Sequence, residues 1–242
     1  MLTPSNLPSN EVVEPGIISQ TSSEDESVRV LLQEIQNEYE RLALDPLVDG
    51  RWRSLSEIDL WLLLCRCILS TEMHYERALT TVEILWQNGH LNPYMIADFG
   101  ENGLTAKLAA LLGNNSKKGR QYSKYFVANA KQLRKLSISW LLSHSESDEQ
   151  AREKLCKHFK GVGLLEATMF LRDSCYARSL VVVDTSLVRF LKMVTFVEPD
   201  FNVSKIRPKT YRLFEYLFRG YCENRQVDHQ RLERAIWKTM QD

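Results

Sequence analysis

The sequence predicts an all-α protein, and three observations lead to this class. Apolar residues recur at the 3.6-residue spacing of an amphipathic helix from Glu26 onward, as at Val28, Leu31, Leu32 and Ile35. Segments that alternate polar and apolar residues, as half-buried strands do, are lacking. Helix-start signals, in which a serine or asparagine precedes an apolar run, stand between the periodic segments.

The helices can be placed in order from these signals. The first is expected to end at Asp45, because Pro46 disfavours helical backbone in the residue before it. Ser56 and Asp59 have the spacing of a capping box and predict a helix over 57–69. That helix is apolar on nearly all sides, so it is expected at the buried centre of a bundle. Further helices are predicted at 75–88, 93–98 (capped by Asn92), 104–112, 118–134, 148–159 (with a capping box of Ser147 and Gln150), 185–197, 208–222 and 228–241.

The N-terminal segment differs from the rest in composition. Residues 1–27 are rich in proline, serine and asparagine and carry five acidic residues without a basic one. Such a segment can bury little apolar surface, so we expect a disordered acidic tail. The alternative is an acidic arm that docks on another protein.

Composition limits the remaining classes. The 242 residues include 31 basic and 31 acidic side chains, so only the distribution of charge can argue for a nucleic-acid partner. The five cysteines are odd in number and lack the spacing of a zinc site or disulfide framework, which predicts a reducing cytosol and no metal. No apolar run is long enough to span a membrane, and the first residues lack the basic start and apolar core typical of a signal peptide. We therefore expect a cytoplasmic protein, nucleoid-associated if prokaryotic, with no membrane contact.

A glycine turn stands between two helical segments in the middle of the chain. Phe159 closes the first segment, Gly161-Val162-Gly163 follows, and a second apolar-periodic segment starts at once. The two glycines permit positive φ and leave backbone amides uncovered. Amides grouped at a helix N-terminus bind anions, so Lys160, Gly161, Val162 and Gly163 are candidate ligands of a nucleic-acid phosphate.

This stretch resembles the helix-hairpin-helix DNA glycosylases, the superfamily of endonuclease III, the adenine glycosylases and the 8-oxoguanine glycosylases. The resemblance lies in Gly161-Val-Gly163, Ala167, Phe170-Leu-Arg172, Val183-Asp-Thr185 and Arg189, and it extends more weakly over roughly 30–240. Phe170-Leu-Arg172 is most similar to the archaeal-type 8-oxoguanine enzymes.

The family resemblance implies two helical domains that flank a cleft. One is expected over 54–178 and ends in the helix-hairpin-helix, and the other joins 28–53 to 179–242. It also implies a monomer that binds double-stranded DNA. The iron–sulfur loop of endonuclease III needs four cysteines near the C-terminus, where only Cys222 lies, so no cofactor is expected. The resemblance does allow a monovalent cation at the hairpin carbonyls.

Two positions carry the expected chemistry. The family's catalytic aspartate corresponds to Asp184, which could stabilise an oxocarbenium-like sugar and activate a water. Alone, an Asp before a helix is also an ordinary N-cap. The lysine with which bifunctional relatives form a Schiff base corresponds to Leu165, and Lys160 precedes the turn and should face the DNA backbone. The resemblance therefore implies a monofunctional glycosylase.

A basic stretch suggests a second contact with DNA. From Lys117 to Lys135 there are seven basic residues and no acidic one. Cations at a helix start oppose the macrodipole, and a phosphate partner would explain them. The alternative is a solvated helix face. The candidate ligands are Lys117, Lys118, Arg120 and Lys124.

The substrate and the remaining site residues are open. Glu72 falls where relatives insert a loop residue into the duplex, although it could equally be an exposed helix end. His74, Ser186 and Leu165 are candidates for the base pocket. The nearest branch implies 8-oxoguanine, and another modified base, including the hypermodified pyrimidines of viral DNA, is the alternative; such a base would indicate defence. Rival hypotheses are a non-catalytic DNA-binding module, against which Asp184 argues, and an all-α scaffold with a fortuitous glycine turn.

Overall fold

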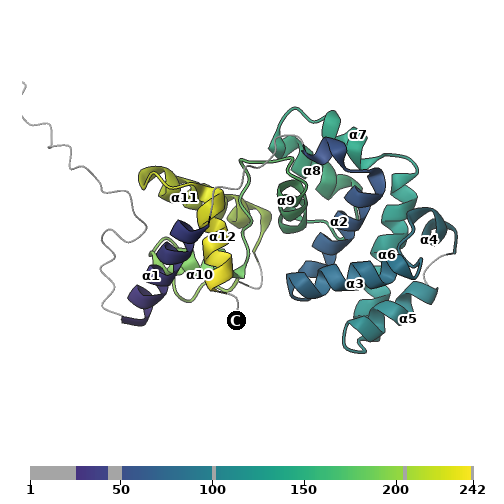
Figure 1. Cartoon of the computed structure of the whole chain (residues 1–242), viewed down its shortest axis with the longest axis horizontal. Coiled ribbons are helices and arrows are strands. Elements are labelled where there is room, and N and C mark those ends of the chain that lie inside the picture. Colours follow the sequence, from purple (N-terminus) through teal and green to yellow (C-terminus); the bar gives the residue numbers. More distant parts are fainter. Residues whose placement is uncertain (1–25, 43–50, 100–101, 204–205, 241–242) are drawn as a thin grey trace, which may run out of the picture. The chain divides into compact units, whose positions relative to one another are not determined.

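The computed structural model describes residues 26–42, 51–99, 102–203 and 206–240, and within these ranges the regular structure is helical throughout (Figure 1). The all-α class is therefore confirmed. The helices are α1 (Glu26–Arg41), η1 (Arg51–Ser54), α2 (Glu57–Ser70), α3 (Tyr75–Gln87), α4 (Pro93–Phe99), α5 (Asn102–Leu111), α6 (Ser116–Leu133), α7 (Ile138–Ser143), α8 (Asp148–His158), α9 (Leu164–Asp173), α10 (Thr185–Met193), α11 (Pro208–Asn224) and α12 (His229–Thr239).

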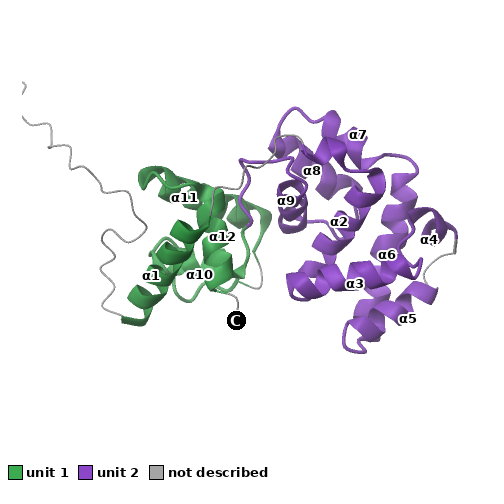
Figure 2. Cartoon of the chain, viewed as in Figure 1, with its two compact units in different colours: residues 1–45, 183–242 green, residues 46–182 purple. Residues whose placement is uncertain are grey.

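The chain divides into two compact units (Figure 2). Unit 1 is Met1–Asp45 with Val183–Asp242, and unit 2 is Pro46–Val182. The boundaries expected at 53/54 and 178/179 lie instead at 45/46 and 182/183, because residues 46–53 and 179–182 belong to unit 2. The expected tail lies outside the described residues except at 26–27, where α1 has already begun.

Unit 2 is built around α2. Leu60, Trp61, Leu64 and Ile68 are buried, which confirms the buried helix predicted here. Ser56 forms the predicted capping box, since its Oγ accepts from the Asp59 amide and the Asp59 carboxylate accepts from the Ser56 amide. The Trp61 indole N–H donates to the Leu91 carbonyl at 2.8 Å, so the one polar atom of this side chain is satisfied in the core.

Local details differ from the expectation, and one is that the helix predicted over 185–197 ends at Met193. Helix α7 was not predicted, because its six residues give too little periodicity to recognise. Ser147 does cap α8 by accepting from the Gln150 amide, but the Gln150 side chain accepts from the Glu146 amide at 2.8 Å rather than from Ser147. The capping box predicted here is therefore only half formed.

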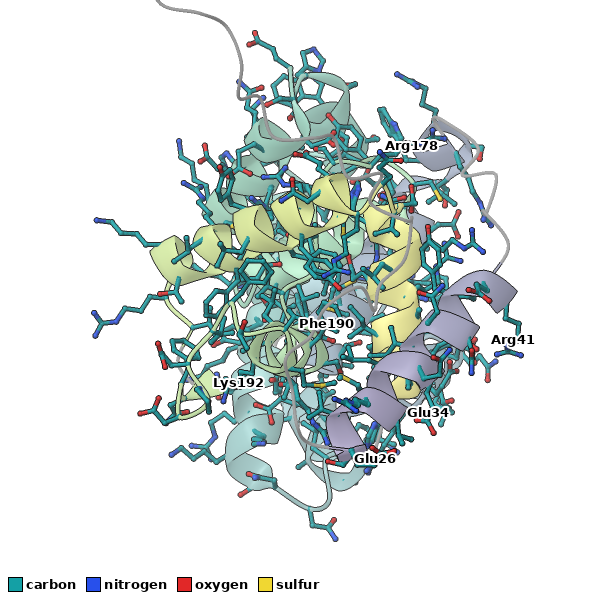
Figure 3. All side chains as sticks on the ribbon, turned by 90° about the vertical axis from the view of Figure 1, so that its left-hand side faces the viewer. Glu26, Glu34, Arg41, Arg178, Phe190 and Lys192 are labelled. Atoms are coloured by element: carbon teal, nitrogen blue, oxygen red, sulfur yellow. The ribbon has the colours of Figure 1, made fainter. Side chains whose placement is uncertain are left out.

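Unit 1 contains α1, α10, α11 and α12 and has its own aromatic core. The Phe190 ring is fully buried and packs edge-on against Phe218 and Tyr221, at centroid distances of 6.1 and 5.4 Å. Figure 3 shows Phe190 inside this group of helices, with Glu34 and Arg41 along the outward side of α1. No helix among the described residues is both long and apolar enough to cross a membrane.

Candidate nucleic-acid interface and active site

The glycine turn has one position that requires glycine for its backbone. Gly161 has φ of +75°, in the left-handed region that other residues rarely adopt. A Cβ there would lie 2.5 Å from the Tyr125 ring, so the position is closed to a side chain on steric grounds as well. Gly163 has φ of −100° and is the N-cap of α9. Positive φ is thus needed at Gly161 alone, which corrects the expectation for both glycines.

A glutamate inside the hairpin covers part of the helix start. Glu166 is the third residue of α9, and its Oε2 accepts from the Gly163 amide at 2.8 Å. Burial raises the pKa of this carboxyl, against the effect of the backbone amides that bond to it. We did not predict Glu166, although its place three residues after the N-cap is the spacing of a capping box.

Helix α6 fixes the turn in place. The buried Asn129 side chain donates to the Lys160 carbonyl at 2.9 Å and accepts from the Lys160 amide at 2.6 Å. Tyr125 lies one helical turn before Asn129 on α6, and its ring covers Gly161. Two features that the sequence predicted separately, the hairpin and the basic helix, are therefore in direct contact within unit 2.

The basic helix presents an open hollow of about 430 Å³. Lys117, Arg120 and Lys124 are exposed, and they have no acidic partner among the described residues. Asn115 caps the helix by accepting from the Lys118 amide at 3.0 Å. The residues that line the hollow are Ser116, Lys117, Arg120, Gln121, Lys124 and Tyr125.

Glu72 and Lys118 lie together. Glu72 is in the turn after α2, and its carboxylate forms an ion pair with the Lys118 ammonium. The neighbouring Tyr122 hydroxyl interacts with Thr71 and Glu72, and burial raises the pKa of this hydroxyl. Each of these two charged residues was expected to contact DNA, and in this structure they neutralise one another.

Asp184 caps α10. Its Oδ1 accepts from the Leu187 amide at 2.8 Å, and the residue is half-buried. The amide of Val183, the residue before Asp184, donates to the Tyr211 hydroxyl at 3.1 Å. This bond holds the backbone that precedes the cap against α11. The carboxylate is therefore fixed by hydrogen bonds and buried neighbours.

The other candidates are divided between the units. Ser186 lies beside Asp184 in unit 1 and is half-buried. Unit 2 holds His74, an exposed residue that precedes α3 without a capping bond, and Leu165, the half-buried second residue of α9. A cleft that joins Asp184, the hairpin and these residues stays a prediction. Among the described residues no group of three or more His, Cys, Asp or Glu could hold a metal ion.

Solved structures of other proteins have a similar fold. The structure of Methanocaldococcus jannaschii 8-oxoguanine glycosylase/lyase in complex with 15mer DNA containing 8-oxoguanine matches 89% of this chain and 91% of its own, with a TM-score of 0.63 at 21% identity. The 8-oxoguanine DNA glycosylase of Thermotoga maritima matches the same shares with a TM-score of 0.62 at 20% identity. At these identities the likeness establishes the fold.

Sequence comparison adds two relatives named 8-oxoguanine DNA glycosylase/AP lyase. The one from Saccharolobus islandicus is 31% identical over 94 residues, and the one from Fusobacterium nucleatum is 26% identical over 88. These matches span 44% and 40% of the relatives and 38% and 36% of this chain, so less than half of either partner is aligned. A family model described as 8-oxoguanine DNA glycosylase matches residues 48–227. Because that match takes in both the hairpin and the segment around Asp184, it confirms the predicted superfamily, and the chain belongs to the 8-oxoguanine DNA glycosylase family.

Proposed function

We propose that this protein is a monofunctional DNA glycosylase, which hydrolyses the N-glycosidic bond of a damaged or modified base in double-stranded DNA and leaves an abasic site. One observation carries the proposal. By the family resemblance, Asp184, which caps α10, corresponds to the catalytic aspartate, whereas Leu165 corresponds to the lysine.

The chemistry requires one carboxylate and one water. As the bond between C1′ and the base nitrogen breaks, its electron pair leaves with the base and the sugar acquires oxocarbenium character. A carboxylate held beside C1′ stabilises that cation without having to reorganise. It also accepts a proton from the water that attacks C1′. The Leu187 amide donates to Oδ1 of Asp184, and a carboxylate can accept more than one hydrogen bond.

The strand should remain intact after base release. Strand cleavage through a Schiff base needs an amine at the sugar, and Leu165 has none. Lys160 is near Leu165 in sequence, but it precedes the glycine turn, and Asn129 of α6 bonds to its backbone carbonyl and amide. The relatives carry AP lyase in their names, so this is the step at which we propose that the chain differs from them.

DNA contact is assigned to the hairpin and to the exposed cations of α6. The start of α9 supplies amides that lack intrahelical carbonyl partners, of which the Gly163 amide donates to the Glu166 carboxylate. Lys117, Arg120 and Lys124 supply positive charge that no acidic side chain within the described ranges offsets. These groups would bind phosphates and not base edges, so they would hold DNA of any sequence while the target base is flipped out.

The Asp184→Asn variant tests the mechanism, because Asn keeps the size and caps a helix about as well as Asp. Base release should fall by orders of magnitude while the melting temperature and DNA affinity are kept. Borohydride should trap no protein–DNA adduct, and the abasic product should stay uncut until alkali is added. Full activity of Asp184→Asn would remove the proposed catalyst, and a trapped adduct would refute the monofunctional assignment.

A second candidate is a non-catalytic DNA-binding protein, which the cap bond of Asp184 favours, since capping alone explains an aspartate there. A mass-spectrometric survey of free bases released from damaged, modified and viral DNA separates the two. Release of 8-oxoguanine would indicate repair, release of a hypermodified viral base would indicate defence, and release of no base would favour the binding protein.

A further inference from the structure

The hollow on α6 lies along a single face of the helix. Its lining residues follow one another at four-residue spacing, as 116, 120 and 124 and as 117, 121 and 125. We call these six residues the α6 stripe. Lys118 and Tyr122 are also four residues apart, but they face the turn that carries Glu72. The helix thus has one face neutralised by Glu72 and another whose cations stand without an acidic partner in the described residues.

The stripe leads directly into the hairpin. Tyr125 is its last residue and is also the residue whose ring covers Gly161. The Gln121 side chain donates to the Tyr125 hydroxyl at 2.8 Å, and Asn129 fixes the turn one helical turn further on. The hairpin turn and the cations of the stripe therefore adjoin one another in unit 2.

On this basis, and given that the chain binds DNA as proposed above, we infer that the hairpin turn and the α6 stripe bind consecutive phosphates of one DNA strand. Lys117 and Tyr125 are eight residues apart, which is about 12 Å along a helix. A strand advances about 3.4 Å along the duplex axis per nucleotide, so a stripe that runs along that axis matches the rise of three or four nucleotides.

The contact between stripe and hairpin favours the strand held at the hairpin as the partner of the adjoining end of the stripe. Across either groove the two strands are separated by about 6 Å or more. A protein surface that held one strand at the hairpin and the other at the stripe would need a gap of that size between its two sets of ligands. At this end of the stripe there is no such gap, because Tyr125 lines the hollow and its ring also covers Gly161.

Uncharged methylphosphonate linkages, placed one at a time along each strand, test the inference. The duplex should carry a single tetrahydrofuran abasic-site analogue, which fixes the register and cannot be turned over. With the full chain, the linkages that weaken binding should form two adjoining blocks on one strand. In Arg120→Ala and Lys124→Ala the block belonging to the stripe should lose its effect, and the other block should keep it.

The protein variants add a second readout and a control. Arg120→Ala and Lys124→Ala should each flatten the slope of log affinity against log salt by about 0.9. Lys107→Ala removes an exposed lysine from the neighbouring helix α5 and should leave both blocks in place. Because the scan changes the DNA and not the protein, misfolding cannot produce the block pattern.

Several results would overturn the inference: a stripe block on the opposite strand, unaffected linkages between the two blocks, or an unchanged pattern in Arg120→Ala and Lys124→Ala. The proposed function fails differently. If the two-block pattern holds but no base is ever released, the glycosylase proposal falls and the strand assignment stands.

Discussion

Glu72 and Lys118 show how a charged pair can set the strength of DNA binding. Their side chains are 28% and 43% exposed, so water screens the ion pair and its contribution is about 1 kcal/mol or less. A phosphate could replace Glu72 at Lys118 at little cost. While the pair is closed, however, Lys118 adds no net charge to the basic helix.

Removing the carboxylate should therefore strengthen DNA binding. In Glu72→Gln, Lys118 keeps its charge and loses its partner, so we expect higher affinity for all sequences and a salt slope steeper by up to about 0.9. Fluorescence anisotropy across a salt series measures both quantities. Glu76→Gln, an exposed change in the first turn of α3, removes the same charge away from Lys118 and controls for net charge. Weaker binding of Glu72→Gln would instead mean that Glu72 itself contacts the duplex.

Leu165 offers a gain-of-function test of the missing amine. It is half-buried near the start of α9, so a lysine there would project from the place that the family resemblance assigns to the nucleophile. We expect borohydride to trap a protein–DNA adduct with Leu165→Lys and none with the parent chain. Leu164→Lys places the amine one residue earlier, about 100° around the helix, and serves as the matched control. Equal trapping by both variants would contradict the assigned position.

At the scale of the element, the hairpin combines local and distant determinants. Gly161 and the start of α9 could be recognised from adjacent residues, because positive φ and helix capping are local properties. Asn129 could not, since it bonds to Lys160 across 31 residues of sequence. The sequence therefore predicted the turn and the basic helix, but it did not predict that α6 holds the turn.

The charge state of Glu166 should make hairpin stability depend on pH. Burial raises the pKa of its carboxyl in the folded protein, so the folded state binds this proton more tightly than the unfolded state. The contribution of Glu166 to stability is then fully present below the ordinary value of 4.5 and is lost as pH rises through the raised folded pKa. Gln keeps an acceptor for the Gly163 amide and has no proton to lose.

We therefore expect Glu166→Gln to gain stability relative to the parent chain as pH rises above 4.5. Melting temperatures of both proteins, compared pH by pH, isolate this group from the other carboxylates. Glu153→Gln, an exposed change on α8, should show no such divergence. A constant difference across the series would mean that Glu166 does not titrate in this range.

At the scale of the whole molecule, the sequence predicted the class, the family and most helices, because periodicity, caps and the hairpin motif each depend on residues that are close together in sequence. The contacts that join these elements were beyond it. The pair of Glu72 and Lys118 spans 46 residues, and neither residue carries a local sign of the other. The net charge did not predict DNA binding either, because the chain has equal numbers of acidic and basic residues although the α6 stripe carries only basic ones.

The division into units separates the proposed DNA contacts from the proposed catalyst. Unit 2 is one continuous segment, Pro46–Val182, and its buried core from Trp52 to Leu180 lies wholly within it. A segment of this length falls in the usual range for an independent domain, about 100–200 residues. It contains the hairpin and the α6 stripe, whereas Asp184 belongs to unit 1.

We therefore expect the fragment 46–182 to fold alone, with a cooperative unfolding transition, and to bind DNA with a salt slope reduced by no more than the phosphate contacts that unit 1 supplies. It should release no base from any substrate that the full chain attacks, because it lacks Asp184. The same fragment with Arg120→Ala and Lys124→Ala should lose most of its affinity, which ties its binding to the stripe. Base release by the fragment would show that the chemistry resides in unit 2 and that Asp184 is no more than the cap of α10.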